Sequence, residues 1–177
     1  MPNIWFCADH HLYHEGVLRF FKADGVTPLR VFDSVTHMNE YIIYKHNLVV
    51  RPQDKVYFLG DVMCSKKAPQ LELLGRMNGE KILIKGNHDY LSLNAYQKFF
   101  KDVRSVYAID GMLLSHIPIH PGSLSRWDIN VHGHCHSNVV TDHNGHPDPR
   151  YFCVSMEQLD DYSPISLDQI NKKLKRK

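Results

Sequence analysis

Five short apolar segments of this chain have the character of β-strands, and each one runs into a residue that can bind a metal ion. The segments cover residues 3–8, 55–59, 81–84, 111–114 and 128–131. The polar residues that follow them are Asp9, Asp61, Asn87, His116 and His134. In open α/β sheets, ligands bind beyond the carboxyl ends of the strands. We therefore expect these five side chains to converge at one edge of the fold.

Two of the five candidates have a second potential ligand two residues further along the chain. Asp9 is followed by His11, and His134 is followed by His136. Residues i and i+2 of an extended segment face the same way, so each pair can grip one ion. A glycine, which lets the backbone turn sharply where a strand ends, comes directly before Asp61, Asn87 and His134.

The candidate ligands are too many for one tetrahedral ion. They are Asp9, His11, Asp61, Asn87, His116, His134 and His136. Carboxylate, imidazole and amide oxygen without thiolate suit Mn²⁺, Fe, Zn²⁺ or Ni²⁺. Two ions roughly 3.5–4 Å apart, with a carboxylate between them, use the whole set and clamp an in-line displacement at phosphorus.

Helical segments separate the first strands. Apolar residues at helical spacing predict helices over residues 34–50, 69–77 and 93–101. Ser166 and Gln169 form a capping-box pattern that predicts the start of a last helix.

After residue 136 the sequence no longer alternates between predicted strands and helices. Residues 139–141 and 151–154 have strand character and flank a turn at 143–145, which predicts an antiparallel hairpin. Strands that alternate with helices, followed by a strand-rich end, predict an α/β fold with a mixed sheet or two packed sheets.

Length and composition narrow the class of protein. The 177 residues suffice for one domain, and 43% hydrophobic with 23% charged residues is ordinary for a globular protein. No apolar run reaches the roughly 18 residues of a transmembrane helix, and Asp9 interrupts the N-terminal stretch too early for a secretory signal. We therefore expect a cytoplasmic protein without membrane contact, and its four singly placed cysteines as free thiols.

The net charge of +2 conceals a basic C-terminal end. Residues 172–177 carry five of the 21 Lys and Arg residues, which leaves 16 basic against 19 acidic residues elsewhere. Cations at a helix C-terminus complement the helix dipole, and we favour this role over a weak contact with a phosphate backbone.

The order of these polar motifs resembles the calcineurin-like metallophosphoesterase superfamily. The motifs are Asp9-x-His11, Gly60-Asp61, Gly86-Asn87-His88-Asp89, His116 and Gly133-His134-x-His136. A compact bacterial and phage branch looks closest, because its opening resembles residues 8–14, its fourth block resembles residues 114–118 and its end resembles residues 162–167.

The resemblance implies a single domain over residues 1–177: two packed mixed sheets flanked by helices, a four-layer sandwich with a dinuclear site. One ion would be held by Asp9, His11 and His136, and the other by Asn87, His116 and His134, with Asp61 bridging. A metal-bridging hydroxide would attack phosphorus. His88 would face the phosphate and protonate the leaving oxygen or stabilise its charge, and Asp89 would orient His88. Asn87 would also contact the substrate. His14 lies one short turn beyond His11, so we expect it to touch the substrate or to orient a ligand.

The expected activity is metal-dependent hydrolysis of small or exposed phosphodiesters, cyclic nucleotides among them, or of phosphomonoesters. Manganese is the favoured metal, with Fe, Zn or Ni as alternatives. A nuclease acting on DNA or RNA and a catalytically weak scaffold on the same fold are the rival hypotheses. A nucleic-acid substrate is less favoured than a small molecule, and a homodimer is left open.

Overall fold

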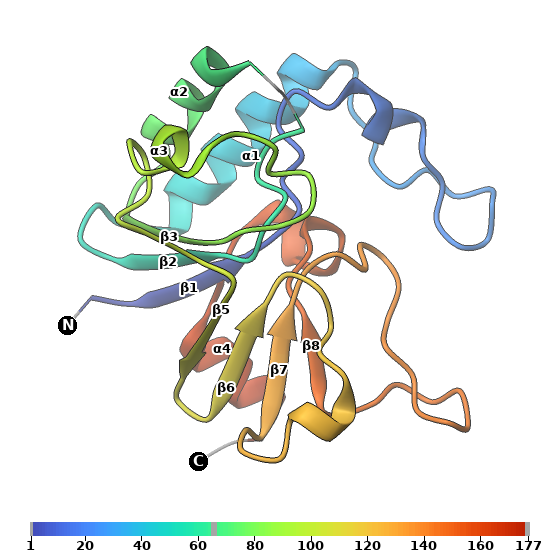
Figure 1. Ribbon diagram of the computed structural model, residues 1–177. Coiled ribbons are helices and arrows are strands. Elements are labelled where there is room, and N and C mark those ends of the chain that lie inside the picture. The colour runs from blue at the N-terminus through green and yellow to red at the C-terminus, as the bar shows by residue number, and fades with distance from the viewer. Residues whose placement is uncertain (1, 65–66, 176–177) are drawn as a thin grey trace.

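Two mixed β-sheets pack against each other at the centre of the structure (Figure 1). The computed structural model describes residues 2–64 and 67–175. The first sheet has the order β4-β3-β2-β1-β9, with β1 (Ile4–Cys7), β2 (Lys55–Phe58), β3 (Glu80–Ile84), β4 (Asp102–Arg104) and β9 (Ile165–Ser166). The second has the order β5-β6-β7-β8, with β5 (Val106–Ile109), β6 (Met112–Ser115), β7 (Ile129–His132) and β8 (Tyr151–Cys153). The α/β fold with two packed mixed sheets is confirmed.

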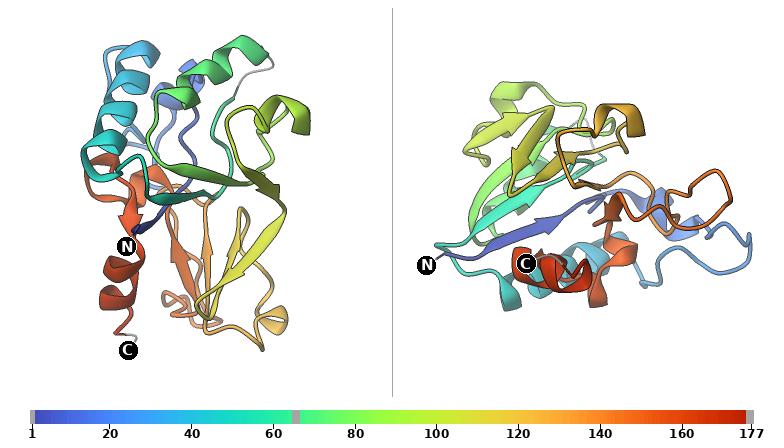
Figure 2. Two further views of the ribbon diagram at one scale, coloured as in Figure 1. Left: turned by 90° about the vertical axis from the view of Figure 1, so that its left-hand side faces the viewer. Right: turned by 90° about the horizontal axis from the view of Figure 1, so that it is seen from below.

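Helices flank the sheets. The first three, α1 (Val35–Val49), α2 (Glu72–Gly75) and α3 (Leu93–Tyr96), lie on the face of the first sheet that is turned away from the second (Figures 1 and 2). The last, α4 (Leu167–Lys173), contacts β1 and β9. Single 3₁₀ turns occur at Glu15–Arg19, Ala68–Leu71, Pro121–Ser123, Met156–Gln158 and Asp160–Tyr162.

No helix of the described residues is long and apolar enough to cross a membrane. Of the basic C-terminal end, Lys172 and Lys173 form the last turn of α4, while Arg176 and Lys177 lie outside the described residues.

The helices begin where the sequence predicts. Of the three helices whose ends were predicted, two end earlier than expected. Ser34 caps α1 by accepting a hydrogen bond from the His37 N–H (3.1 Å), and Ser166 with Gln169 completes the predicted capping box of α4. The predicted helix 69–77 is a 3₁₀ turn followed by only four α-helical residues. The predicted helix 93–101 ends at Tyr96, because the chain must reach the edge strand β4 at residue 102.

The predicted antiparallel hairpin is wrong. The turn forms, with Thr141 bridged to Pro147, but β8 pairs in parallel with β7 rather than with residues 139–141. Pairing at the edge of the second sheet places Val154 in the core, fully buried, and this burial outweighs the local turn signal.

Parallel pairing fixes where the functional loops lie. Strands β1, β2 and β3 are mutually parallel, and so are β6 and β7. Their carboxyl ends therefore open toward one edge of the sandwich, where the five polar loops leave the sheets.

The core beneath this edge is aromatic. Phe58 in β2 is fully buried and contacts the rings of His10 (5.0 Å between centroids), His46 (5.7 Å) and Phe100 (5.4 Å). Tyr57 of the first sheet meets Tyr107 of the second at 5.4 Å, so the aromatic contacts also join the two sheets.

Truncation of Phe58 tests this packing. We expect Phe58→Ala to lower the free energy of unfolding by about 3–5 kcal/mol, because it removes a large buried ring and leaves a cavity. Tyr44→Ala on the exposed side of α1, where the ring is 59% exposed, should change it by about 0.5 kcal/mol or less. Equal effects in a denaturant titration would contradict this description of the core.

Candidate metal centre

The loops after the strands bring six of the seven predicted ligands into two adjoining clusters. Each cluster holds three side chains whose ligand atoms lie within 4.8 Å of one another. The first consists of Asp9, His11 and His136, and the second of Asp61, His116 and His134.

Asp61 lies between the two clusters. Its Oδ2 is 3.8 Å from His11 Nε2 of the first cluster and 3.4 Å from His116 Nε2 of its own. The seventh predicted ligand, Asn87, adjoins the second cluster, with its Oδ1 2.9 Å from His116 Nε2. A carboxylate in this position can face two ions at once.

The backbone is left-handed at five of the seven predicted ligands. The residues and their φ angles are Asp9 (58°), His11 (49°), Asp61 (51°), His134 (67°) and His136 (50°). This conformation costs an L-residue roughly 1–2 kcal/mol, and such strain tends to concentrate at functional sites. The sharp turns are therefore made by the ligand residues themselves, in addition to the glycines that precede them.

All three of those glycines are needed for space, and a Cβ on Gly60 would lie 2.4 Å from Nδ1 of His116. A Cβ on Gly86 would collide with Oδ1 of Asp61, and a Cβ on Gly133 would lie 2.6 Å from Oδ2 of Asp9. The backbone thus passes directly beside two carboxylates of the clusters.

Several buried polar atoms in the clusters lack a protein partner. Oδ2 of Asp9 accepts hydrogen bonds from Ser155 Oγ (2.6 Å) and the His134 N–H (2.8 Å). Its Oδ1 and both ring nitrogens of His11 have none. Burying a polar atom without a partner is costly, and a divalent cation would satisfy Oδ1 of Asp9 and one nitrogen of His11. The donor set therefore fits a metal ion.

Hydrogen bonds set the tautomers of two histidines. Nδ1 of His116 lies 2.8 Å from the carbonyl oxygen of Leu59, and Nδ1 of His136 lies 3.1 Å from Oε1 of Glu157. Because both partners are acceptors, each Nδ1 carries the proton. A metal would displace any second proton at Nε2, and the Nδ1 hydrogen bonds would raise the basicity of both rings as ligands.

A fully buried arginine supports the first cluster, and the sequence analysis missed it. Arg30 donates to the backbone carbonyls of Asp9 and of His10 (2.7 Å). Its Nε donates to Glu157 Oε1 at 2.8 Å, the same oxygen that contacts His136. Arg30 and Glu157 are 127 residues apart and belong to none of the motifs, so no local signal could pair them.

Burial and neighbouring charges oppose each other in setting the pKa values at this site, and which of the two prevails differs from group to group. Burial raises the pKa of Asp9 to about 6, although His136 and His116 oppose it. Burial works against the charged form of His116, but Asp61 and Asp9 outweigh it and raise the pKa of His116 to about 9. Burial likewise opposes ionisation of Glu157, yet Arg30 and His136 hold its pKa at about 2.

His88 lies at the rim of the site. Its backbone N–H donates to Oδ1 of Asp61 (2.8 Å), and its ring meets the His11 ring edge-on at 5.4 Å. Nδ1 of His88 is 2.5 Å from the hydroxyl of Tyr90. Tyr90 is a neighbour of the site that the sequence analysis did not single out.

The predicted orientation of His88 by Asp89 is corrected by the structure. The buried Asp89 carboxylate accepts backbone N–H bonds from Gly86 (2.8 Å), Asp61 (2.9 Å) and Val62 (3.1 Å). Both of its oxygens are used in this way, because the left-handed turn at Asp61 leaves N–H groups that need an acceptor. Asp89 therefore ties the loop after β2 to the loop after β3, while the His88 ring contacts the side chains of Tyr90 and His11.

His14 lies one short turn beyond His11, with their ring centroids 5.4 Å apart. The His14 ring also contacts the Phe20 ring edge-on, with their centroids 5.6 Å apart. A ligand atom of His14 also lies within 4.8 Å of those of His11 and Cys64. His14 thus borders the clusters, as a substrate-contacting residue would.

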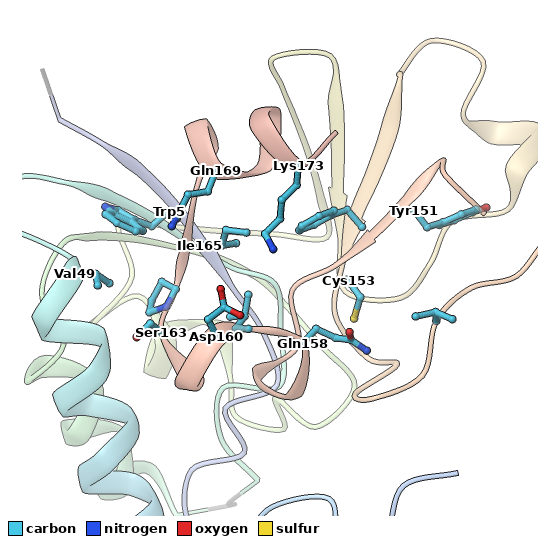
Figure 3. Close-up of a pocket in the computed structure, with 14 residues that line it drawn as sticks. Trp5, Val49, Tyr151, Cys153, Gln158, Asp160, Ser163, Ile165, Gln169 and Lys173 are labelled. Atoms are coloured by element: carbon cyan, nitrogen blue, oxygen red, sulfur yellow. The ribbon is translucent and has the colours of Figure 1, made fainter. Parts of the chain in front are cut away.

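A pocket lined in part by the residues of β8 is separate from the metal clusters. Figure 3 shows it among α4, β8 and β9, with Trp5, Asp160 and Lys173 on its walls. Its volume is about 380 Å³. The predicted metal ligands lie outside its lining. The clusters, not this pocket, hold the reactive groups.

Replacing Glu157 by glutamine tests the support of His136. Gln keeps an oxygen for Arg30 but removes the charge that strengthens His136 as a ligand, so we expect metal affinity to fall by about 10- to 100-fold. Isothermal calorimetry with Mn²⁺ measures this, with the exposed Glu72→Gln as control. Unchanged affinity in Glu157→Gln, with unfolding temperature preserved, would contradict the role of Glu157.

Known proteins resemble this chain along its whole length. It matches the calcineurin-like phosphoesterase family over residues 2–176. It is 34% identical over 180 residues to an uncharacterized protein of Methanocaldococcus jannaschii, covering 99% of this chain and 93% of that protein. It also shares the fold of a solved protein of unknown function from Aquifex aeolicus, with a TM-score of 0.73, 24% identity, and coverage of 98% of this chain and 100% of that one. The chain therefore belongs to the calcineurin-like phosphoesterase family.

Proposed function

We propose that this protein hydrolyses small or exposed phosphodiesters, phosphomonoesters or both with the help of two divalent metal ions. One observation carries the proposal: two adjoining three-ligand clusters share an edge at Asp61 and hold buried ligand atoms without protein partners. Family membership supports the phosphoester as the bond that is cleaved.

The proposed ligand sets follow the clusters. Asp9, His11 and His136 would hold one ion, and Asn87, His116 and His134 the other, with Asp61 between them. Manganese is the proposed metal, because the donors are carboxylate, imidazole and amide oxygen rather than thiolate. When bound, two such ions lower the pKa of a coordinated water and neutralise phosphate charge.

His88 is the proposed general acid. Its backbone bond to Asp61 fixes the position of the residue beside both clusters. As a general acid the ring would act in its imidazolium form, in which Nδ1–H donates to the Tyr90 hydroxyl oxygen and Nε2 carries the second proton. From there it can be passed to the oxygen that leaves phosphorus, while Asn87 and His14 bind the phosphate.

Hydrolysis of two chromogenic esters tests the function. We expect metal-stripped protein to hydrolyse bis(p-nitrophenyl) phosphate or p-nitrophenyl phosphate only after Mn²⁺ is added. His88→Ala should keep its metal content by elemental analysis and lose about 10²-fold or more in kcat. The exposed His143→Ala serves as control.

The outcomes separate the rival hypotheses. Absence of turnover with Mn²⁺, Zn²⁺ and Ni²⁺ alike would contradict the esterase and favour a scaffold. Preference for an oligonucleotide over both small esters would favour a nuclease. Wild-type rates in His88→Ala would remove His88 from the mechanism.

The raised pKa of His116 predicts that metal binding depends on pH. Below its pKa of about 9, the metal-free ring is protonated, so a metal must displace that proton. Metal affinity should therefore rise from pH 6.5 toward pH 9, and should fall more steeply below about pH 6, where Asp9 also takes up a proton. Calorimetry in two buffers of different ionisation enthalpy counts the released protons. Binding at neutral pH without proton release would contradict this assignment.

A further inference from the structure

The hollow beside the metal clusters has one aromatic wall. Two of the predicted ligands, His134 and His136, line this hollow of about 410 Å³, and Phe20 and Phe21 line it as well. Both phenylalanine rings are exposed, Phe20 by 50% and Phe21 by 56%. They come from the loop of residues 20–29, which projects on the same side of the molecule as the loop after β7 (Figures 1 and 2).

The loop holds these rings in place. The Leu29 N–H donates to the Phe20 carbonyl, and the Lys22 N–H donates to the Thr27 carbonyl, both at 2.8 Å. At the tip, the Asp24 carboxylate accepts the Thr27 N–H (2.9 Å) and hydroxyl (2.6 Å). The rings are therefore presented by an ordered turn, so little ordering remains to be done on binding.

A chain of ring contacts leads from the metal ligands to this wall. His11 meets His14 at 5.4 Å, and His14 meets Phe20 at 5.6 Å. A substrate whose phosphate lies at the clusters would consequently place its organic group over the exposed rings.

The chemistry of the walls indicates the class of that organic group. Exposed aromatic rings bind planar π systems by stacking. The facing wall offers the hydroxyl of Ser137 and the exposed amide of Asn138, which can donate to and accept from the edge of such a ring. Besides the two histidines, every side chain in the lining is uncharged. A neutral planar group with polar edges, such as a nucleobase, matches both walls.

We propose that this hollow is a base-binding subsite, and that the substrate is a nucleoside phosphodiester whose base stacks on Phe20 and Phe21. The inference rests on the proposed phosphodiester hydrolysis at the clusters. In that reaction water adds to phosphorus, the P–O bond to the leaving group breaks, and a phosphomonoester and an alcohol or phenol result.

Two esters with the same leaving group test the subsite. Thymidine 5′-(p-nitrophenyl phosphate) and methyl p-nitrophenyl phosphate both release p-nitrophenol and differ in the retained group. We expect wild-type protein loaded with Mn²⁺ to favour the thymidine ester in kcat/KM by about 5- to 150-fold, the range that base stacking provides. Phe20→Ala and Phe21→Ala should lower kcat/KM for the thymidine ester and bring the ratio toward one.

Matched variants separate stacking from simple apolar contact. Phe21→Leu keeps apolar bulk but loses the ring face, so the preference should still fall. Tyr44→Ala removes an exposed ring on α1, 59% exposed and outside the lining of the hollow, and should leave the ratio unchanged. A full preference retained in Phe21→Leu would overturn the stacking role.

A binding measurement makes the inference independent of turnover. We expect calorimetry with Mn²⁺-loaded protein to show tighter binding of thymidine 5′-monophosphate than of methyl phosphate, and loss of that difference in Phe21→Ala. Hydrolysis of both esters at equal efficiency, with equal binding of the two phosphates, would overturn the subsite and leave the phosphoesterase intact. Failure to hydrolyse either ester would contradict the phosphoesterase, and calorimetry would still decide the subsite.

Binding of oligothymidylates of increasing length distinguishes a small substrate from a nucleic-acid strand. An affinity gain confined to the first nucleotide supports a small substrate. A gain with every added nucleotide would overturn the small substrate in favour of a strand.

Discussion

The left-handed backbone at the cluster residues is the constraint on which the rest of the structure depends. Each such residue is strained, so the loops must be held from outside. Arg30 does this after β1 by binding the carbonyls of Asp9 and His10. Asp89 does it after β2 by accepting the N–H groups of Asp61 and Val62. Two buried charged residues, neither of them a proposed metal ligand, thus hold the geometry of the site.

Those supports also explain how so many ionisable groups are buried together. Glu157 compensates the Arg30 guanidinium and at the same time contacts His136. A buried charge is tolerated only when it is paired and hydrogen-bonded, and this pair satisfies both conditions. Oδ1 of Asp9 and the ring nitrogens of His11 lack a hydrogen-bond partner, and so do Oε2 of Glu157 and the ring nitrogens of His10. A metal ion would give a partner to Oδ1 of Asp9 and to one nitrogen of His11.

The sequence predicted which residues come together at the candidate site better than it predicted the chain around them. A strand followed by a polar ligand is a local pattern, so the positions of Asp9 and Asp61 could be predicted, and parallel pairing brought them together. The edge strands β4, β5 and β9 were missed, since strands of two to four residues carry too little periodicity. The partnership of Arg30 with Glu157 and the parallel pairing of β8 depend on contacts distant in sequence. Asp89 was placed correctly beside the site, but its hydrogen bonds follow from backbone geometry that no motif encodes.

One segment of the chain, residues 9–30, supplies both the first proposed metal ligands and the proposed base-binding wall. It leaves β1 at Asp9, passes His11 and His14, presents Phe20 and Phe21, and ends at Arg30. The Arg30 guanidinium then returns to the carbonyl of Asp9, so the segment is closed at its base. Because the same buried cation fixes the ligand loop and the end of the aromatic loop, the two cannot move far apart. A phosphate at the clusters and a base on the rings would therefore be bound in a fixed relation, which is the condition under which binding energy at a remote group contributes to the reacting bond.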